Sequence, residues 1–89
     1  MLRIIDSALR HGYTEETLKK IWETVPEDTV VRVRHDRMPP HYMMLGTAPT
    51  GETVELIAFT DGFDWFLFHA MPAASGSFAR EYKMNGGRL

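Results

Sequence analysis

The segment from residue 29 to residue 71 constrains the fold most, because it contains four strand-like stretches separated by short turns. The stretches are rich in β-branched and aromatic residues, which favour extended backbone. Residues 37–41 include two prolines and cannot continue a strand ladder, residues 49–52 combine proline with glycine, and Asp61-Gly62 is a strong hairpin signal. Connections this short join antiparallel neighbours. The predicted strands are residues 29–35, 42–48, 53–60 and 63–71.

Helices are predicted on either side of this segment. Apolar residues recur at helical spacing up to Gly12, a typical C-terminal stop, so a short helix is expected to end near His11. Thr14 caps a second helix, which Pro26 ends. The apolar stripe of this second helix consists of Leu18, Ile21, Trp22 and Val25. A short C-terminal helix is predicted over residues 77–83, with Ser77 as its cap.

This order of elements predicts an α+β fold. Two N-terminal helices are expected to pack on a four-stranded antiparallel sheet, followed by a short C-terminal helix or tail. The last strand is apolar on both faces and is therefore expected in the interior of the sheet. No repeat, linker or low-complexity tract divides the chain, so residues 1–89 are predicted to form a single domain.

Composition excludes several classes of function. The chain has no cysteine, which excludes disulfides, thiol nucleophiles and zinc fingers and favours a reducing cytoplasm. Its formal net charge of −2 predicts no general attraction to nucleic acid or anionic membranes, so a role on RNA needs a local basic patch. No apolar run approaches the roughly 20 residues of a membrane span, and no signal peptide is expected.

Histidines are the candidate groups for proton transfer, because imidazole serves as acid or base near neutral pH. His69 lies near the end of the last predicted strand, where a side chain is well placed to enter a cleft. The alternative is a half-buried histidine bonded to a backbone carbonyl. His41 is a second candidate, whereas His11 is expected to interact with a helix dipole.

Two polar clusters offer cations that match phosphate oxygens. Arg34 lies near the end of the first predicted strand and Arg37 on the connection after it; this cluster reads equally well as a solvated edge loop. Arg80 and Lys83 lie three residues apart on the predicted C-terminal helix and are able to reach one phosphate together; the alternative is a solvated helix end.

A metal site on His35, Asp36 and His41 is a further hypothesis. No ligand spacing such as His-Glu-x-x-His accompanies these residues, and no glycine-rich phosphate loop or nucleophile elbow is present. We therefore predict no metal and no cofactor.

Two motifs resemble the BrnT-like toxins of bacterial type II toxin–antitoxin modules. The first is LRHGYTEE at residues 9–16, which precedes the amphipathic helix, and the second is FHAMPA at residues 68–73, which closes the last strand. Residues 80–82 are similar to the arginine-rich C-terminal segment of that family. The resemblance extends from about Ile4 to Tyr82.

The resemblance implies a compact RelE-type fold, an RNA substrate and an activity that halts translation. It also implies a cognate antitoxin, usually a small DNA-binding protein, and therefore a hetero-oligomer of toxin and antitoxin. On this hypothesis the protein is a cytoplasmic, metal-independent endoribonuclease without a membrane partner. The catalytic residues are then His69, Arg80 and His41, and the RNA phosphate-binding residues are Arg34, Arg37 and Lys83.

A non-catalytic protein-binding module of the same fold is the alternative. The slightly acidic charge favours it, as does the exposed edge that the first predicted strand offers to a partner. The enzyme is expected to cleave RNA in the presence of a chelator, whereas the binding module forms only a tight complex with the product of an adjacent gene. Loss of activity in chelator would instead indicate the metal site.

Overall fold

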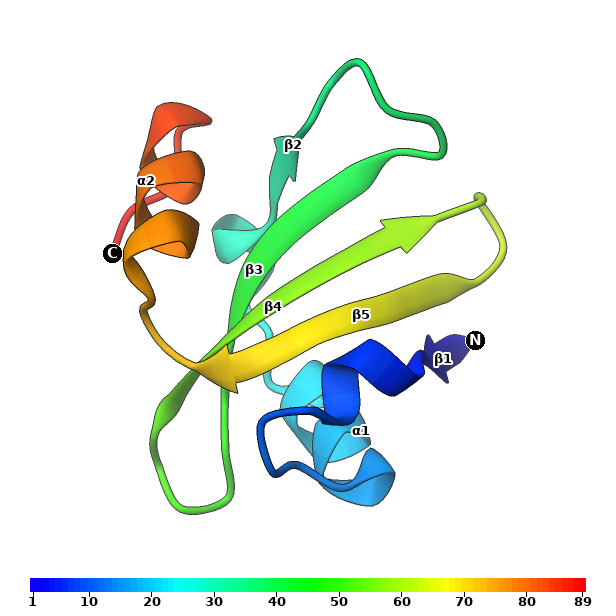
Figure 1. Ribbon diagram of the computed structural model, residues 1–89, viewed down its shortest axis with the longest axis vertical. Helices are drawn as coiled ribbons and strands as arrows, with labels where there is room; N and C mark the ends of the chain where they lie inside the picture. Colours follow the sequence, from blue (N-terminus) through cyan, green and yellow to red (C-terminus); the bar gives the residue numbers. More distant parts are fainter.

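The computed structural model describes residues 1–89, in which a five-stranded mixed sheet carries helices on both faces (Figure 1). In space the strands follow the order β1-β5-β4-β3-β2; β1 and β5 are parallel, and the other neighbours are antiparallel. The strands are β1 (Leu2–Ile4), β2 (Val31–Val33), β3 (His41–Thr47), β4 (Thr53–Thr60) and β5 (Trp65–Pro72). The helices are α1 (Glu15–Glu23) and α2 (Gly76–Met84), with 3-10 turns η1 (Asp6–Leu9) and η2 (Glu27–Thr29). Neither α1 nor α2 has the length and apolar character that a membrane-spanning helix requires.

The predicted architecture of two N-terminal helices on a four-stranded antiparallel sheet is wrong in two respects. The chain begins with strand β1, whose parallel pairing makes the sheet mixed, and the expected first helix is reduced to the turn η1. The amide of Ile5 donates to the carbonyl of Leu67 at 2.9 Å, so the backbone here bonds to β5 rather than along a helix. A strand of three residues is too short to show the period of two by which strands are recognised.

The first predicted strand, residues 29–35, is also shorter than expected. Only Val31–Val33 form β2, because Thr29 belongs to η2 and Arg34 has a left-handed backbone with φ of 51°. Non-glycine residues rarely adopt that conformation, and it ends the strand. The other three predicted strands are confirmed within two residues at each end, and β5 lies in the interior of the sheet as expected.

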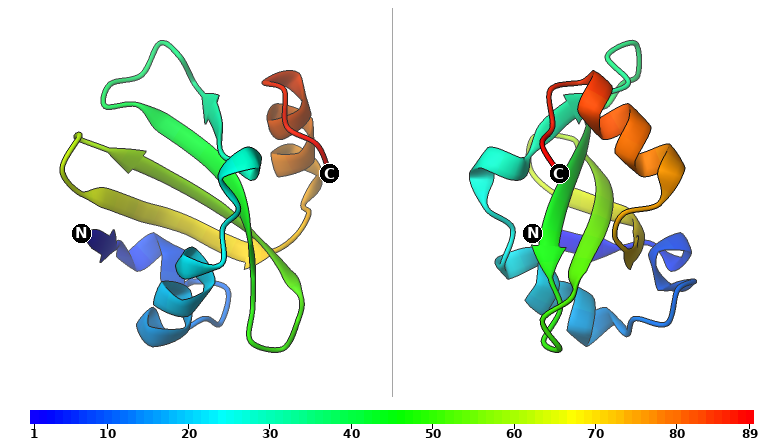
Figure 2. Two further views of the ribbon diagram at one scale, coloured as in Figure 1. Left: turned by 180° about the vertical axis from the view of Figure 1, so that it is seen from behind. Right: turned by 90° about the vertical axis from the view of Figure 1, so that its left-hand side faces the viewer.

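Helix α1 is confirmed where its cap and apolar stripe place it. The Thr14 hydroxyl accepts a hydrogen bond from the Thr17 amide at 3.1 Å, which satisfies one of the free amides of the first turn. Leu18 and Ile21 are fully buried in the main core, between α1 and one face of the sheet. Figure 2 shows α1 and α2 on opposite faces.

Gly46 on β3 is the point of closest approach between the sheet and α1. A Cβ atom there would lie 2.7 Å from Ile21 Cγ2 and 2.9 Å from the Ile21 carbonyl oxygen, which is backbone and cannot rotate away. We expect Gly46→Ala to lower the free energy of unfolding by about 1–3 kcal/mol, measured by urea denaturation.

The matched control for this change is Gly76→Ala at the start of α2, where a Cβ meets nothing within 4 Å. The same added methyl group should there raise stability by about 0.4–1 kcal/mol, because alanine restricts the unfolded chain. Equal effects of the two substitutions would contradict the close contact at Gly46.

A bulge in β5 decides which side chains reach the face of the sheet opposite α1. The register between β4 and β5 shifts near the middle of the strands and leaves one extra residue in β5. Leu67 and Ala70 point into the core beneath α1, whereas Phe68 and His69, although adjacent, both line a pocket on the other face. Strict alternation would instead have placed His69 on the same face as Leu67.

Helix α2 covers part of that second face. Phe78 and Tyr82 pack against Val33, Met43 and Ile57 in a smaller core. Burial, with Asp28 nearby, raises the pKa of Tyr82. The Tyr82 hydroxyl therefore stays protonated and donates to the Thr29 carbonyl at 2.7 Å, which fixes α2 to η2.

The N-terminal strand is held by Asp64, the last residue of the β4–β5 turn. Its carboxylate lies 3.2 Å from the terminal amine of Met1 and 3.1 Å from Arg3 Nε. Hydrogen bonds from the terminal amine, and then from Arg3, hold the pKa of Asp64 below its usual value. A depressed folded-state pKa adds stability above the unfolded pKa of about 4, and this stability is lost as pH falls through the folded value.

We therefore expect Asp64→Asn to lower Tm at pH 7, with a difference from the wild type that shrinks as the pH falls well below 4. Asp36→Asn is the control, because Asp36 is exposed and makes no hydrogen bond or ion pair. Thermal melts at pH 7 and pH 2.5 measure both; a difference that persists unchanged at pH 2.5 would contradict the assignment.

Candidate active site

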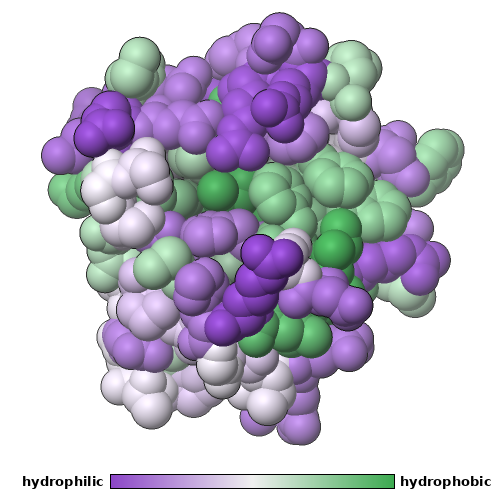
Figure 3. All heavy atoms as spheres, in the orientation of Figure 1, coloured by the Kyte–Doolittle hydropathy of each residue, from purple (hydrophilic) through white to green (hydrophobic).

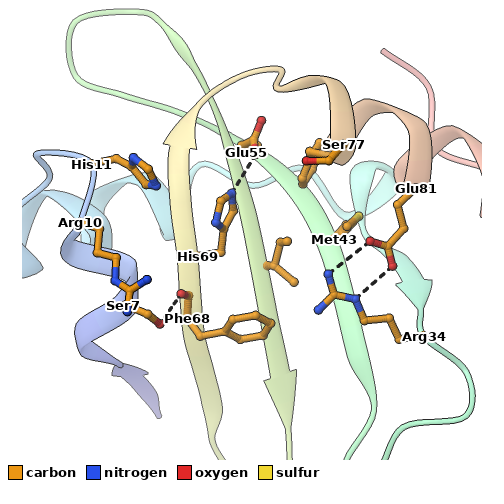
Figure 4. A pocket seen from close by; sticks show the side chains of 12 residues that line it. Ser7, Arg10, His11, Arg34, Met43, Glu55, Phe68, His69, Ser77 and Glu81 are labelled. Carbon is orange, nitrogen blue, oxygen red and sulfur yellow. Dashed lines mark hydrogen bonds and ion pairs between the residues drawn. The ribbon is translucent and has the colours of Figure 1, made fainter.

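A pocket of about 400 Å³ opens on the face of the sheet that α2 leaves partly uncovered (Figure 4). Strands β3, β4 and β5 form its floor, η1 and the residues after it form one wall, and the end of β2 with α2 forms the other. The lining residues are Ser7, Arg10, His11, Arg34, Met43, Glu55, Ile57, Phe68, His69, Ser77, Phe78 and Glu81.

Glu55 on β4 is the buried charged residue of this pocket, with 0% of its surface exposed. Its carboxylate accepts three hydrogen bonds: from His69 Nε2 at 2.8 Å, from the Ser75 amide at 2.6 Å and from the Ser75 hydroxyl at 2.9 Å. Burying a carboxylate is costly unless donors replace its water, and these three do so. Glu55 therefore orients both the His69 ring and the start of α2.

His69 and His11 form a pair of imidazoles at the mouth of the pocket. Their ring centroids are 5.9 Å apart, and the rings are inclined at 69°. The bond to Glu55 occupies the Nε2–H of His69 and leaves its Nδ1 as the acceptor nitrogen. His11 lies on the exposed connection between η1 and α1, and Figure 4 shows its ring near that of His69.

The two arginines of the pocket differ in their pairing. Arg34 donates from Nε and Nη2 to the two carboxylate oxygens of Glu81, at 3.0 and 3.2 Å, and so joins the end of β2 to α2. Arg10 is exposed and makes no ion pair, which leaves its charge available to an anion in the pocket. The strained backbone of Arg34 is of the kind that clusters at functional sites.

Of the six site residues that the sequence predicts, the pocket contains His69 and Arg34. His41 does not line it: its ring is buried against Phe59 and Phe68, and its Nδ1 donates to the Pro39 carbonyl at 2.8 Å. The remaining three, Arg37, Arg80 and Lys83, are exposed and lie outside the lining.

The sequence-based prediction of site residues missed three polar residues of the pocket, namely Glu55, His11 and Arg10. Glu55 interrupts the apolar run of residues 54–59, and a carboxylate in such a run signals a buried, paired charge. Arg10 and His11 belong to the motif at residues 9–16, but nothing local shows that they reach the pocket, because they do so only through the packing of η1 beside β5.

The metal site considered for His35, Asp36 and His41 does not form. No three histidine, aspartate or glutamate side chains lie close enough to hold a metal ion. His35 Nε2 instead donates to Asn85 Oδ1 at 3.3 Å, and His41 is bonded to Pro39. The two histidines considered as ligands therefore have other partners.

Comparison with protein-family models, with curated protein sequences and with solved structures gave no match to this chain.

Proposed function

We propose that this protein is a metal-independent endoribonuclease, acting in the cytoplasm as the toxin of a bacterial type II toxin–antitoxin module. The observation that carries the proposal is the pair of imidazoles, His69 and His11, with Glu55 behind one of them and Arg10 beside them. The two motifs that resemble BrnT-like toxins supply three of these four residues, although they are far apart in the sequence.

The chemistry needs one group to accept a proton and another to donate one. In RNA cleavage without metal, the 2′-oxygen bonds to phosphorus as the P–O5′ bond breaks, giving a 2′,3′-cyclic phosphate and a 5′-hydroxyl. His69 Nδ1 takes the proton of the 2′-hydroxyl, because Glu55 holds the other ring nitrogen in its protonated form. Protonated His11 gives a proton to the leaving O5′.

The phosphate needs a cation while charge develops on its oxygens. Arg10 meets this need, because its guanidinium is free and lies on the same wall as His11. Arg34 is paired with Glu81 and therefore has a structural role, because the pair holds α2 beside the pocket.

The decisive experiment is cleavage of an end-labelled RNA by purified protein in excess EDTA. We expect fragments that end in a 2′,3′-cyclic phosphate, and no cleavage of the same sequence as DNA or as 2′-O-methyl RNA, which lack the nucleophile. The assay is repeated with ribosomes. Absence of cleavage in both formats, or products with a 5′-phosphate, would overturn the proposal.

Arg10→Gln tests the phosphate contact. We expect this change to lower kcat/KM about 10- to 100-fold, since one charge-assisted contact to the phosphate contributes about 1.5–3 kcal/mol. Arg88→Gln is the matched control, because Arg88 is also exposed and unpaired but lies in the C-terminal tail, outside the pocket. Equal activity of the two variants would remove Arg10 from the mechanism.

The toxin role has its own test in cells. Expression of the wild type in bacteria is expected to arrest growth, and co-expression of the protein encoded by the adjacent gene is expected to relieve the arrest. If the protein cleaves RNA in vitro but its expression does not affect growth, the protein is a ribonuclease without a toxin role.

A further inference from the structure

A row of ring side chains crosses the sheet next to the pocket. Phe66 on β5 pairs in register with Phe59 on β4, and Phe59 pairs with His41 on β3. Beyond Phe66, the next position across the sheet is Arg3 on β1, which is the register partner of Phe66. These four residues share one face, because residues paired directly across a sheet point to the same side.

The rings of this row form one cluster with Phe68, which lines the pocket. Phe59 and Phe66 are stacked, with centroids 5.0 Å apart and an interplanar angle of 15°, and Phe68 lies 5.8 Å from Phe59. His41 contacts both Phe59 and Phe68. We call the rings of Phe59, Phe66 and Phe68 the aromatic surface.

The aromatic surface is only partly buried. All three phenylalanines keep intermediate exposure, although each ring has enough apolar area to stabilise a core. Figure 3 shows the corresponding face, with a hydrophobic band beside α2, hydrophilic surface above it and mixed surface below it. Helix α2 therefore leaves part of this face without a partner from the chain itself.

The aromatic surface is continuous with the candidate active site. Along β4, Glu55, Ile57 and Phe59 follow one another on the same face, and successive same-face residues of a strand are about 7 Å apart. Ile57 is the register partner of His69 on the neighbouring strand, so Phe59 lies one such step along β4 from the position opposite His69. The rings are therefore within reach of a nucleotide held at His69.

We propose that the aromatic surface binds a nucleobase of single-stranded RNA, on the nucleotide next to the scissile phosphate. This inference rests on the proposed function. A nucleobase is planar and stacks on aromatic rings, and it is accessible for stacking when RNA is single-stranded. The free guanidinium of Arg10 in the adjoining pocket complements the phosphate of the same strand.

The first test measures binding without cleavage. Wild-type protein is titrated with a short fluorescent 2′-O-methyl oligonucleotide, and with two versions that lack one base, on the 5′ or the 3′ side of the central phosphate. Loss of the stacked base on one side is expected to weaken binding about 5- to 100-fold. This titration uses only wild-type protein, so its result does not depend on whether a variant folds.

The second test couples the base to the rings. Phe66→Leu is expected to weaken binding of the intact oligonucleotide by a similar factor, and to bind the intact and base-deleted versions almost equally, because the two changes remove the same contact. Phe63→Leu is the matched control: Phe63 is 89% exposed in the β4–β5 turn and is not part of the row. Thermal melts check that each variant is folded.

The outcomes separate this inference from the proposed function. Equal binding of intact and base-deleted oligonucleotides by the wild type would overturn the inference, while cleavage that depends on His69 would leave the proposed function intact. Base-dependent binding without any RNA cleavage would support the inference and overturn the proposed function. Failure of the wild type to bind any oligonucleotide would also overturn the inference. If the wild type then binds the product of the adjacent gene, and Phe66→Leu weakens that complex, the surface binds a protein instead.

Discussion

His69→Gln is expected to lower kcat/KM for RNA cleavage about 100- to 10,000-fold, the usual contribution of a positioned acid or base. Glutamine can still donate to Glu55 through its amide nitrogen, so the buried carboxylate keeps a partner and the fold is retained. It has no nitrogen that accepts a proton near neutral pH. Cleavage of a labelled RNA in EDTA, under single-turnover conditions, measures the loss of the chemical step.

Two controls make this result specific. The Tm of His69→Gln should remain close to that of the wild type, which excludes unfolding as the cause. In His69→Ala, added imidazole is expected to restore part of the cleavage, because the small base can enter the space that the side chain leaves. Cleavage by His69→Gln within threefold of the wild type would exclude His69 as the proton acceptor.

Glu55→Leu is expected to cause a large loss of stability, about 2–5 kcal/mol in the free energy of unfolding. The substitution leaves the Ser75 amide and His69 Nε2, both partly buried, without their acceptor. Urea denaturation measures the effect. Glu23→Leu is the control, because Glu23 is exposed on α1 and unpaired, and its replacement should change stability by no more than about 0.5 kcal/mol.

The isosteric change Glu55→Gln separates the two roles of this residue. Its volume is preserved, so the loss of stability is expected to be smaller than for leucine, while cleavage falls at least about 100-fold because the ring of His69 is no longer held in one tautomer. A gain of stability in Glu55→Leu would instead show that apolar burial outweighs the three hydrogen bonds, as it does for some buried ion pairs.

Local patterns predicted those elements whose stability is determined locally. Helix α1 follows from the Thr14 cap and the apolar stripe, because both act between residues three or four positions apart. Strands β3, β4 and β5 follow from runs of seven or eight residues separated by recognisable turns. Strand β1 has three residues and pairs with a strand more than 60 positions away, so no local pattern reveals it.

The residues of the candidate site also differ in whether a local pattern predicts them. The sequence by itself determined that His69 stands near the end of a strand and that Arg34 belongs to a polar cluster, since residue type and local pattern suffice for both. Only the tertiary structure decided that His69 faces the pocket, because the bulge in β5 reverses the expected alternation. It also decided that Glu55 orients His69 and that η1 brings His11 and Arg10 beside it, since these contacts join segments whose separation in the chain carries no pattern.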